Sequence, residues 1–124
     1  MPTEKYFEAL RLTQKHHTSQ TKTFSGQFTW KNRHRIKEII DQFDIHSILD
    51  YGCGRGKQYH ENVDEKGQNL EQYWGIQTTK YDPGVSMYSR EPQGKFDLVI
   101  CVQVLGSIPK SDLPWVVNRL YGFA

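Results

Sequence analysis

The segment from Ile48 to Gln58, ILDYGCGRGKQ, constrains the fold of this chain more than any other part of the sequence. A short apolar run ends near Asp50, and three glycines then follow in the pattern D-x-G-x-G-x-G. Glycines in such a turn permit positive φ angles and leave room for a ligand to approach the backbone. The free N–H groups of a following helix would point at that ligand. The segment therefore predicts a buried strand, a tight ligand-binding turn and a helix.

Two other glycine-rich nucleotide motifs fit this turn less well. A phosphate-binding loop has the pattern G-x-x-x-x-G-K-[ST], which puts Tyr51 where its first glycine belongs and Gln58 where its hydroxyl residue belongs. The phosphate loop is therefore excluded. The dinucleotide pattern G-x-G-x-x-G needs its third glycine one residue later than Gly56. The chain also lacks a following βαβ half that would hold a second nucleotide, so dinucleotide binding is disfavoured.

The rest of the sequence predicts helices and strands in alternation around this turn. Helical spacing of apolar residues and capping residues predict helices at 4–12, at 30–43, at 57–66 and from Ser111 or Asp112 onward. Apolar runs predict strands at 46–51, 74–81 and 95–104, and polar composition predicts a loop at 13–29. This order fits an open, mostly parallel α/β sheet whose ligand site lies at the carboxyl ends of the strands.

The composition allows one modest domain with a thin core, since the chain has 124 residues of which 36% are hydrophobic. The formal net charge of +2 indicates no particular partner, but the charge is unevenly placed. One short stretch holds Lys31, Arg33, His34, Arg35 and Lys37. Such a stretch is either the solvated face of a helix or a site for an anionic substrate.

The sequence also bears on location and on metals. Cys53 and Cys101 make no disulfide framework, and we expect both to be free thiols in a reducing cytoplasm. No apolar run approaches the roughly 20 residues of a membrane span, and the N-terminus lacks the apolar core of a signal peptide. Adjacent side chains such as His16 and His17 do not converge well on one ion, so no metal site is predicted.

Three ordered motifs make the chain resemble the class I S-adenosylmethionine-dependent methyltransferases. The D-x-G-x-G-x-G turn is similar to the first motif of that family, and Tyr81-Asp82-Pro83-Gly84 is similar to the second. The segment 95–105, with Ile108-Pro109 after it, resembles the fourth. The match runs from about residue 45 to the C-terminus, and the set resembles the methyltransferase-like proteins common in bacteriophage genomes.

The resemblance implies a fold and a set of cofactor-binding residues. The fold would be a Rossmann-like three-layer α/β sandwich in one domain, with the core at 45–124 after a helical and loop region at 1–44. The cofactor would be S-adenosylmethionine, with Asp82 on its ribose hydroxyls. The glycine turn would hold the methionyl part through Asp50, Tyr51, Gly52, Cys53, Gly54 and Gly56. The residues bordering the adenine and the sulfonium would be Pro83, Met87, Cys101, Val102 and Gln103.

The segment after the fourth-motif strand departs from the family. Relatives often have V-L-E-H-I-P there, whereas this chain has Gly106 and Ser107 in place of the acid and the histidine. Gln103 stands where an aspartate is common. Methyl transfer is an in-line displacement that needs a base only when the acceptor must lose a proton. The departure therefore leaves transfer possible and leaves no residue to name as catalytic.

The chain is also short for the seven-stranded class I fold. Only about 14 residues separate Asp82 from Phe96, so we expect the third strand and its helix to be reduced or missing. The sequence ends before strands five to seven, which would leave the fourth strand as an unpaired apolar edge. The chain is then either a fragment of a longer product or a homo-oligomer, most simply a two-fold dimer.

The leading functional hypothesis is methyl transfer from S-adenosylmethionine to an unidentified acceptor. The main alternative is a cofactor-binding module or regulator without transferase activity, which the missing acid and histidine favour. A nicotinamide-binding domain is a weaker alternative because of the glycine spacing. The basic stretch permits a nucleic-acid substrate, but no N-P-P-[YF] motif of the amino-methylating DNA enzymes follows the fourth-motif strand.

Overall fold

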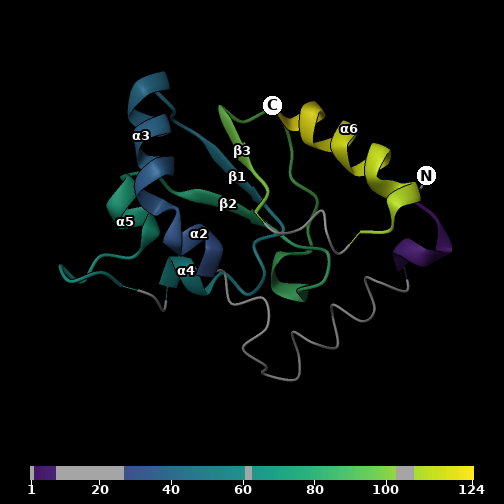
Figure 1. Cartoon of the computed structure of the whole chain (residues 1–124), viewed down its shortest axis with the longest axis horizontal. Coiled ribbons are helices and arrows are strands. Elements are labelled where there is room, and N and C mark those ends of the chain that lie inside the picture. Colours follow the sequence, from purple (N-terminus) through teal and green to yellow (C-terminus); the bar gives the residue numbers. More distant parts are fainter. Residues whose placement is uncertain (1, 8–26, 61–62, 103–107) are drawn as a thin grey trace.

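The computed structural model describes residues 2–7, 27–60, 63–102 and 108–124 (Figure 1). After a helical turn at residues 4–7, its elements are α2 (Gln27–Lys31), α3 (Arg33–Phe43), β1 (Ile48–Tyr51), α4 (Lys57–His60), α5 (Leu70–Trp74), β2 (Thr78–Tyr81), η1 (Ser86–Tyr88), β3 (Leu98–Ile100), η3 (Lys110–Asp112) and α6 (Leu113–Phe123).

The strands of the described residues form one parallel sheet in the order β2-β1-β3. The central residue Leu49 is level with Thr79 on β2 and with Val99 on β3. Because all three strands run the same way, their carboxyl ends meet at one edge of the sheet. The described residues that follow β1, β2 and β3, which include Gly52, Asp82 and Cys101, are thereby brought to the same edge.

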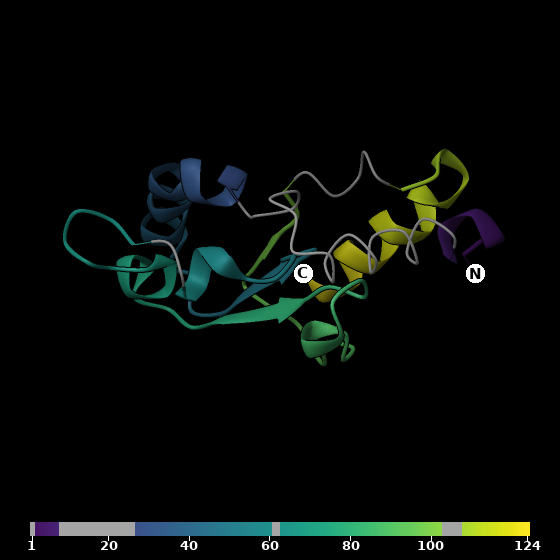
Figure 2. The same ribbon diagram turned by 90° about the horizontal axis from the view of Figure 1, so that it is seen from below.

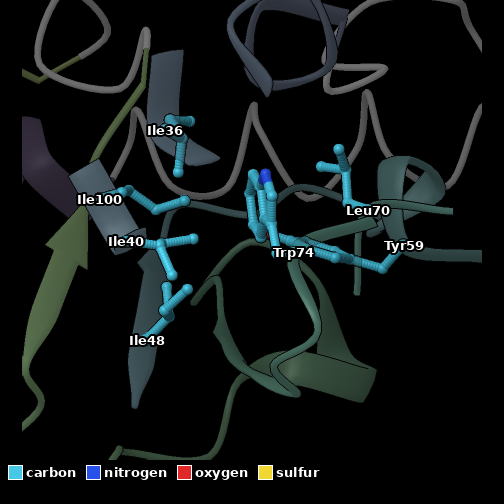
Figure 3. Packing of buried hydrophobic residues seen from close by; sticks show 7 residues of the cluster. All are labelled: Ile36, Ile40, Ile48, Tyr59, Leu70, Trp74 and Ile100. Carbon is cyan, nitrogen blue, oxygen red and sulfur yellow. The ribbon is translucent and has the colours of Figure 1, made fainter. Parts of the chain in front are cut away.

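Neighbouring residues of β1 enter two different cores, one on each face of the sheet. Ile48 packs with residues of α3, α4 and α5, namely Ile36, Ile40, Tyr59, Leu70 and Trp74, and with Ile100 of β3 (Figure 3). Leu49 packs on the other face with Tyr51, Tyr81 and Val116 of α6. This alternation is the period of two of a β-strand. Helices cover both faces, so the predicted three-layer α/β architecture with a parallel sheet is confirmed.

The reduction of the fold is also confirmed for the described residues. Between β2 and β3 the chain makes the short 3-10 turn η1 and no strand. β2 forms one edge of the described sheet, and β3, which pairs with β1, forms the other. The edge is short, since β3 has three residues rather than the ten predicted at 95–104. A strand cannot be longer than its pairing allows, and β1 offers four residues.

The predicted helix at 57–66 and strand at 74–81 are both wrong in extent. α4 ends at His60, and a second helix, α5, begins at Leu70. Asn69 accepts a hydrogen bond from the Gln72 backbone N–H, and the Gln72 side chain accepts one from the Asn69 N–H, which makes a capping box. Trp74 consequently belongs to α5, where it is buried, and β2 begins only at Thr78.

The predicted single helix at 30–43 is two helices, α2 and α3, separated at Asn32, and α2 takes in the last residues of the predicted loop 13–29. The last helix begins after Asp112 as predicted, with Pro114 in its first turn. The Asp112 side chain makes no cap bond, however. Its carboxylate accepts the backbone N–H and the hydroxyl of Thr3, both at 2.6 Å, so it ties the N-terminal segment to α6.

Candidate functional site

The glycine turn after β1 has the backbone conformation that its sequence predicts. Gly52, Gly54 and Gly56 have φ angles of 87°, 62° and 71°, in the region that side chains disfavour. The backbone N–H groups of Gly52 and Cys53 both donate to the Tyr81 carbonyl, at 2.7 and 3.2 Å. The turn is therefore fastened to the end of β2, next to the second predicted motif.

Asp82 joins the first and second motifs through its side chain. This residue is buried, with 8% of its surface exposed. Its Oδ2 accepts the Gly54 N–H at 2.9 Å, and its Oδ1 accepts the Gly84 N–H at 2.8 Å. An ionised carboxylate has about four acceptor positions, so after the bonds to described residues each oxygen retains one. Asp82 thus shapes the glycine turn and can still accept two further hydrogen bonds.

Tyr88 is a member of this site that the sequence patterns did not indicate. The Asp82 N–H donates to its carbonyl at 2.9 Å, which folds η1 back toward β2. The phenol ring lies against Gly56, where an added Cβ would be 3.0 Å from the hydroxyl and 3.2 Å from the ring. Burial raises the pKa of Tyr88. No periodicity marks such a residue, because its contact joins a loop to a turn 32 positions earlier.

Asp50 faces the helix behind the turn. Its Oδ2 accepts the Tyr59 hydroxyl at 2.5 Å and the Gln58 side-chain amide at 3.3 Å, and both donors belong to α4. Gln58 also donates to the Cys53 carbonyl, at 3.2 Å. Burial raises the pKa of Asp50 to about 6, against the opposing effect of these hydrogen bonds. The leading acid of the motif therefore connects β1, the glycine turn and α4.

The remaining predicted residues lie at the same edge of the sheet in different settings. Tyr51 turns to the α6 face, where it is buried near Arg119, and Cys53 is buried within the turn. Cys101 and Val102 follow β3 and are half-buried, and Pro83 is half-buried beside Asp82. Met87 is 78% exposed on η1. Gln103 lies outside the described residues. Both cysteines are free thiols, and burial raises the pKa of Cys101 to about 11.

A polar cluster on the α6 face holds the loop after η1. Arg119 of α6 donates from one guanidinium nitrogen to both carboxylate oxygens of Glu91, at 2.6 and 2.5 Å. Its Nε lies 3.5 Å from the Tyr51 hydroxyl, and its guanidinium lies over the ring of Trp115. The cluster links α6 to the end of β1 and to the segment between Asp82 and β3. It positions that segment without belonging to the glycine turn.

Substitution of Gly56 with alanine should destabilise the protein and disturb the site. The positive φ alone costs at least about 1 kcal/mol, and the new methyl would press on the Tyr88 ring. Gly94→Ala is the matched control, because Gly94 has a φ of 82° and no atom within 4 Å of an added Cβ. Urea unfolding should show a larger loss of stability for Gly56→Ala than for Gly94→Ala. Adding Tyr88→Ala should remove the excess, and equal losses in both single variants would contradict the contact.

Two other kinds of site find no support in the described part of the chain. No group of three or more histidine, cysteine or acidic side chains there could hold a metal ion. Among the helices that are described, none has the length and apolar character needed to cross a membrane. His16 and His17 lie outside the described residues.

Comparison with known proteins identifies the family. A family model described as a methyltransferase domain matches residues 13–121. No curated protein and no solved structure gives a significant match. The matched range contains the glycine turn, Asp82 and Tyr88, the residues that the structure brings together at the carboxyl edge of the sheet. The chain therefore belongs to the methyltransferase domain family.

Proposed function

We propose that the chain binds S-adenosylmethionine over its glycine turn and transfers the cofactor's methyl group to an acceptor. The observation that carries the proposal is the bond between the first and second motifs, in which the Asp82 carboxylate accepts the Gly54 N–H and keeps acceptor positions on both oxygens. Two vicinal ribose hydroxyls need two such acceptors. A charged acceptor also makes the stronger class of hydrogen bond.

The residues around Asp82 fit the same cofactor. Gly52, Gly54 and Cys53 present a backbone without bulky side chains, which suits the methionyl part. Pro83, Met87, Cys101, Val102 and Gln103 are proposed to border the adenine and the sulfonium. We add Tyr88, whose ring closes one side of the turn at Gly56. Asp50 is proposed to hold the turn in position through its hydrogen bond with Tyr59 of α4. Tyr51 is proposed to support the turn as a buried residue directly before it.

The chemistry requires little from the protein beyond position. The bound cofactor supplies a methyl group on a sulfonium, whose S–C bond breaks as the bond from carbon to the acceptor forms. Holding acceptor and cofactor in line contributes much of the rate in such a displacement. No side chain is assigned as a base. This chain has Gly106 and Ser107 where relatives have an acid and a histidine. An acceptor that need not lose a proton before it reacts is compatible with that difference.

Those two substitutions also favour a second candidate, a module that binds S-adenosylmethionine without transferring the methyl group. A dimer formed through the β3 edge stays a prediction, and a monomer in light scattering at micromolar concentration would contradict it. A cytoplasmic location and a bacteriophage source stay predictions from the sequence.

Calorimetric titration of the protein with S-adenosylmethionine, its demethylated product and NAD tests the proposal. We expect binding of the first two and none of NAD. Tighter binding of the demethylated product would favour turnover over the binding-only module. Binding of NAD alone, or of none of the three, would contradict the proposed cofactor.

A further inference from the structure

We propose that the surface formed by α2, the start of α3 and the start of α4 binds the phosphate backbone of a single-stranded nucleic acid that carries the methyl acceptor. The inference names a substrate class for the proposed methyl transfer and rests on that function for its chemistry. The binding itself rests on charge and position, and can be measured without the cofactor.

The first observation is the segregation of charge along the chain. Residues 27–37 and 51–60 contain no aspartate or glutamate, and they hold six of the sixteen lysines and arginines and two of the five histidines, His34 and His60.

 All fourteen acids therefore lie in the rest of the chain, which has only ten lysines and arginines. The two stretches carry a formal charge of +6 and the remainder carries −4. A net charge of +2 hides this separation along the chain, and a surface with an excess of positive charge attracts polyanions.

The second observation is that the two stretches lie together beside the proposed cofactor site. α2 contacts both α3 and α4, and Figures 1 and 2 show α2 next to α4 at one end of the molecule. α4 follows the glycine turn directly. A strand of nucleic acid held on this surface would therefore run close to the turn, where the methyl group is to be transferred.

The cations of this surface differ in exposure and in position. The Arg33 guanidinium stacks on the Trp30 ring at 4.3 Å, and Lys37 pairs with Asp41 at 3.0 Å. Lys31 and Arg35 are exposed, and Arg55 and Lys57 are half-buried at the turn. We assign the backbone contacts to these last four residues. Lys31 and Arg35 are chosen for their exposure, and Arg55 and Lys57 because charge at the turn would place the bound strand.

Aromatic rings among these cations favour a single strand over a duplex. Trp30 and Tyr73 are partly exposed, and the Tyr73 hydroxyl is hydrogen-bonded to His34 at 2.7 Å. Surfaces for single strands combine positive charge with aromatic faces on which bases stack, and each stacked base is worth about 1–3 kcal/mol. α2 and α4 have five and four residues, which is short for a helix that reads a major groove.

Charge reversal at two exposed positions tests the proposal. The variant is Lys31→Glu with Arg35→Glu. The matched control is Lys5→Glu with Lys110→Glu, two exposed positions in the N-terminal helical turn and in η3, and Figure 1 shows the N-terminal turn at the other end of the molecule from α2. Fluorescence anisotropy with labelled thymidine and uridine oligonucleotides measures affinity between about 50 and about 200 mM NaCl. The variant should bind at least about tenfold more weakly. The slope of the logarithm of the binding constant against the logarithm of salt concentration should be smaller by about 1.4, because each of the two lost phosphate contacts contributes about 0.7. The control should stay within about twofold of the unmodified protein.

Several results would overturn the proposal. These are no binding of either oligonucleotide, equal losses in variant and control, or binding to phosphatidylserine vesicles with none to the oligonucleotides. Thermal unfolding checks that the variant and the control both fold. If the variant does not fold, Lys31→Gln with Arg35→Gln replaces it. Calorimetry with S-adenosylmethionine separates the two proposals. Binding of the cofactor without binding of an oligonucleotide would contradict only the nucleic-acid surface. Binding of an oligonucleotide without binding of the cofactor would contradict only the proposed cofactor.

Discussion

Replacing Asp82 with alanine should weaken S-adenosylmethionine binding by roughly 1.5–3 kcal/mol, the range for hydrogen bonds to a charged group. That range corresponds to a loss of affinity of about tenfold to about 150-fold. The change should also destabilise the protein, by about 2 kcal/mol or more, since the N–H groups of Gly54 and Gly84 lose their acceptor. Calorimetry and urea unfolding measure the two effects.

The control for Asp82 is another aspartate that accepts two backbone N–H groups. Asp64 accepts those of Lys66 and Gln68, both at 2.9 Å, in the exposed loop before α5. Asp64→Ala removes the same kind of bonds away from the proposed site, so cofactor affinity should not change. If folded Asp82→Ala binds the cofactor as tightly as the unmodified protein, Asp82 does not hold the ribose hydroxyls.

Replacing Asp50 with asparagine should remove a pH dependence of stability that the buried carboxyl creates. Burial raises the pKa of Asp50 from 3.8 to about 6, so between these values the folded protein binds more protons than the unfolded chain. Stability then falls as pH rises through this window and stays lower above it. A difference of about two pKa units corresponds to about 3 kcal/mol. Asparagine stays neutral at all these pH values and can still accept from Tyr59.

Urea unfolding between about pH 4 and pH 7 tests this prediction. The stability of Asp50→Asn minus that of the unmodified protein should grow across the window by up to about 3 kcal/mol. The buried Oε1 of Gln58 has no hydrogen-bond partner among the described residues, and it would gain a possible donor in the new side-chain amide. Asp41→Asn, an exposed acid on α3, serves as the control. A difference that stays constant with pH would show that Asp50 titrates alike in both states.

The sequence predicted the parts of the fold that local chemistry determines. The apolar run and glycines after Leu49 predicted β1 and its turn, and the turn has the expected positive φ angles at Gly52 and Gly54. The resemblance to the methyltransferases implied that Asp82 belongs to the same site as that turn, and its carboxylate does contact the turn. These features depend on a few neighbouring residues and on the direction of the chain.

The parts that were missed depend on contacts between distant residues or on competing patterns. Tyr88 belongs to the site because its ring reaches Gly56, which no local pattern reveals. Trp74 was assigned to a strand because aromatic residues favour strands, but the capping box at Asn69 places it in α5. An asparagine followed three residues later by glutamine was the available signal.

Chemical-shift mapping of backbone amides during titration with S-adenosylmethionine tests the central claim most directly, because it locates the cofactor on the chain. The proposed site predicts that the largest shifts fall on the glycine turn and on the loop after β2, at Gly52, Gly54, Gly84 and Tyr88. Amides at the opposite edge of the sheet, such as those of Asp44 and His46 before β1, should shift little. Shifts centred away from the turn and Asp82, or no shifts at saturating cofactor, would contradict it.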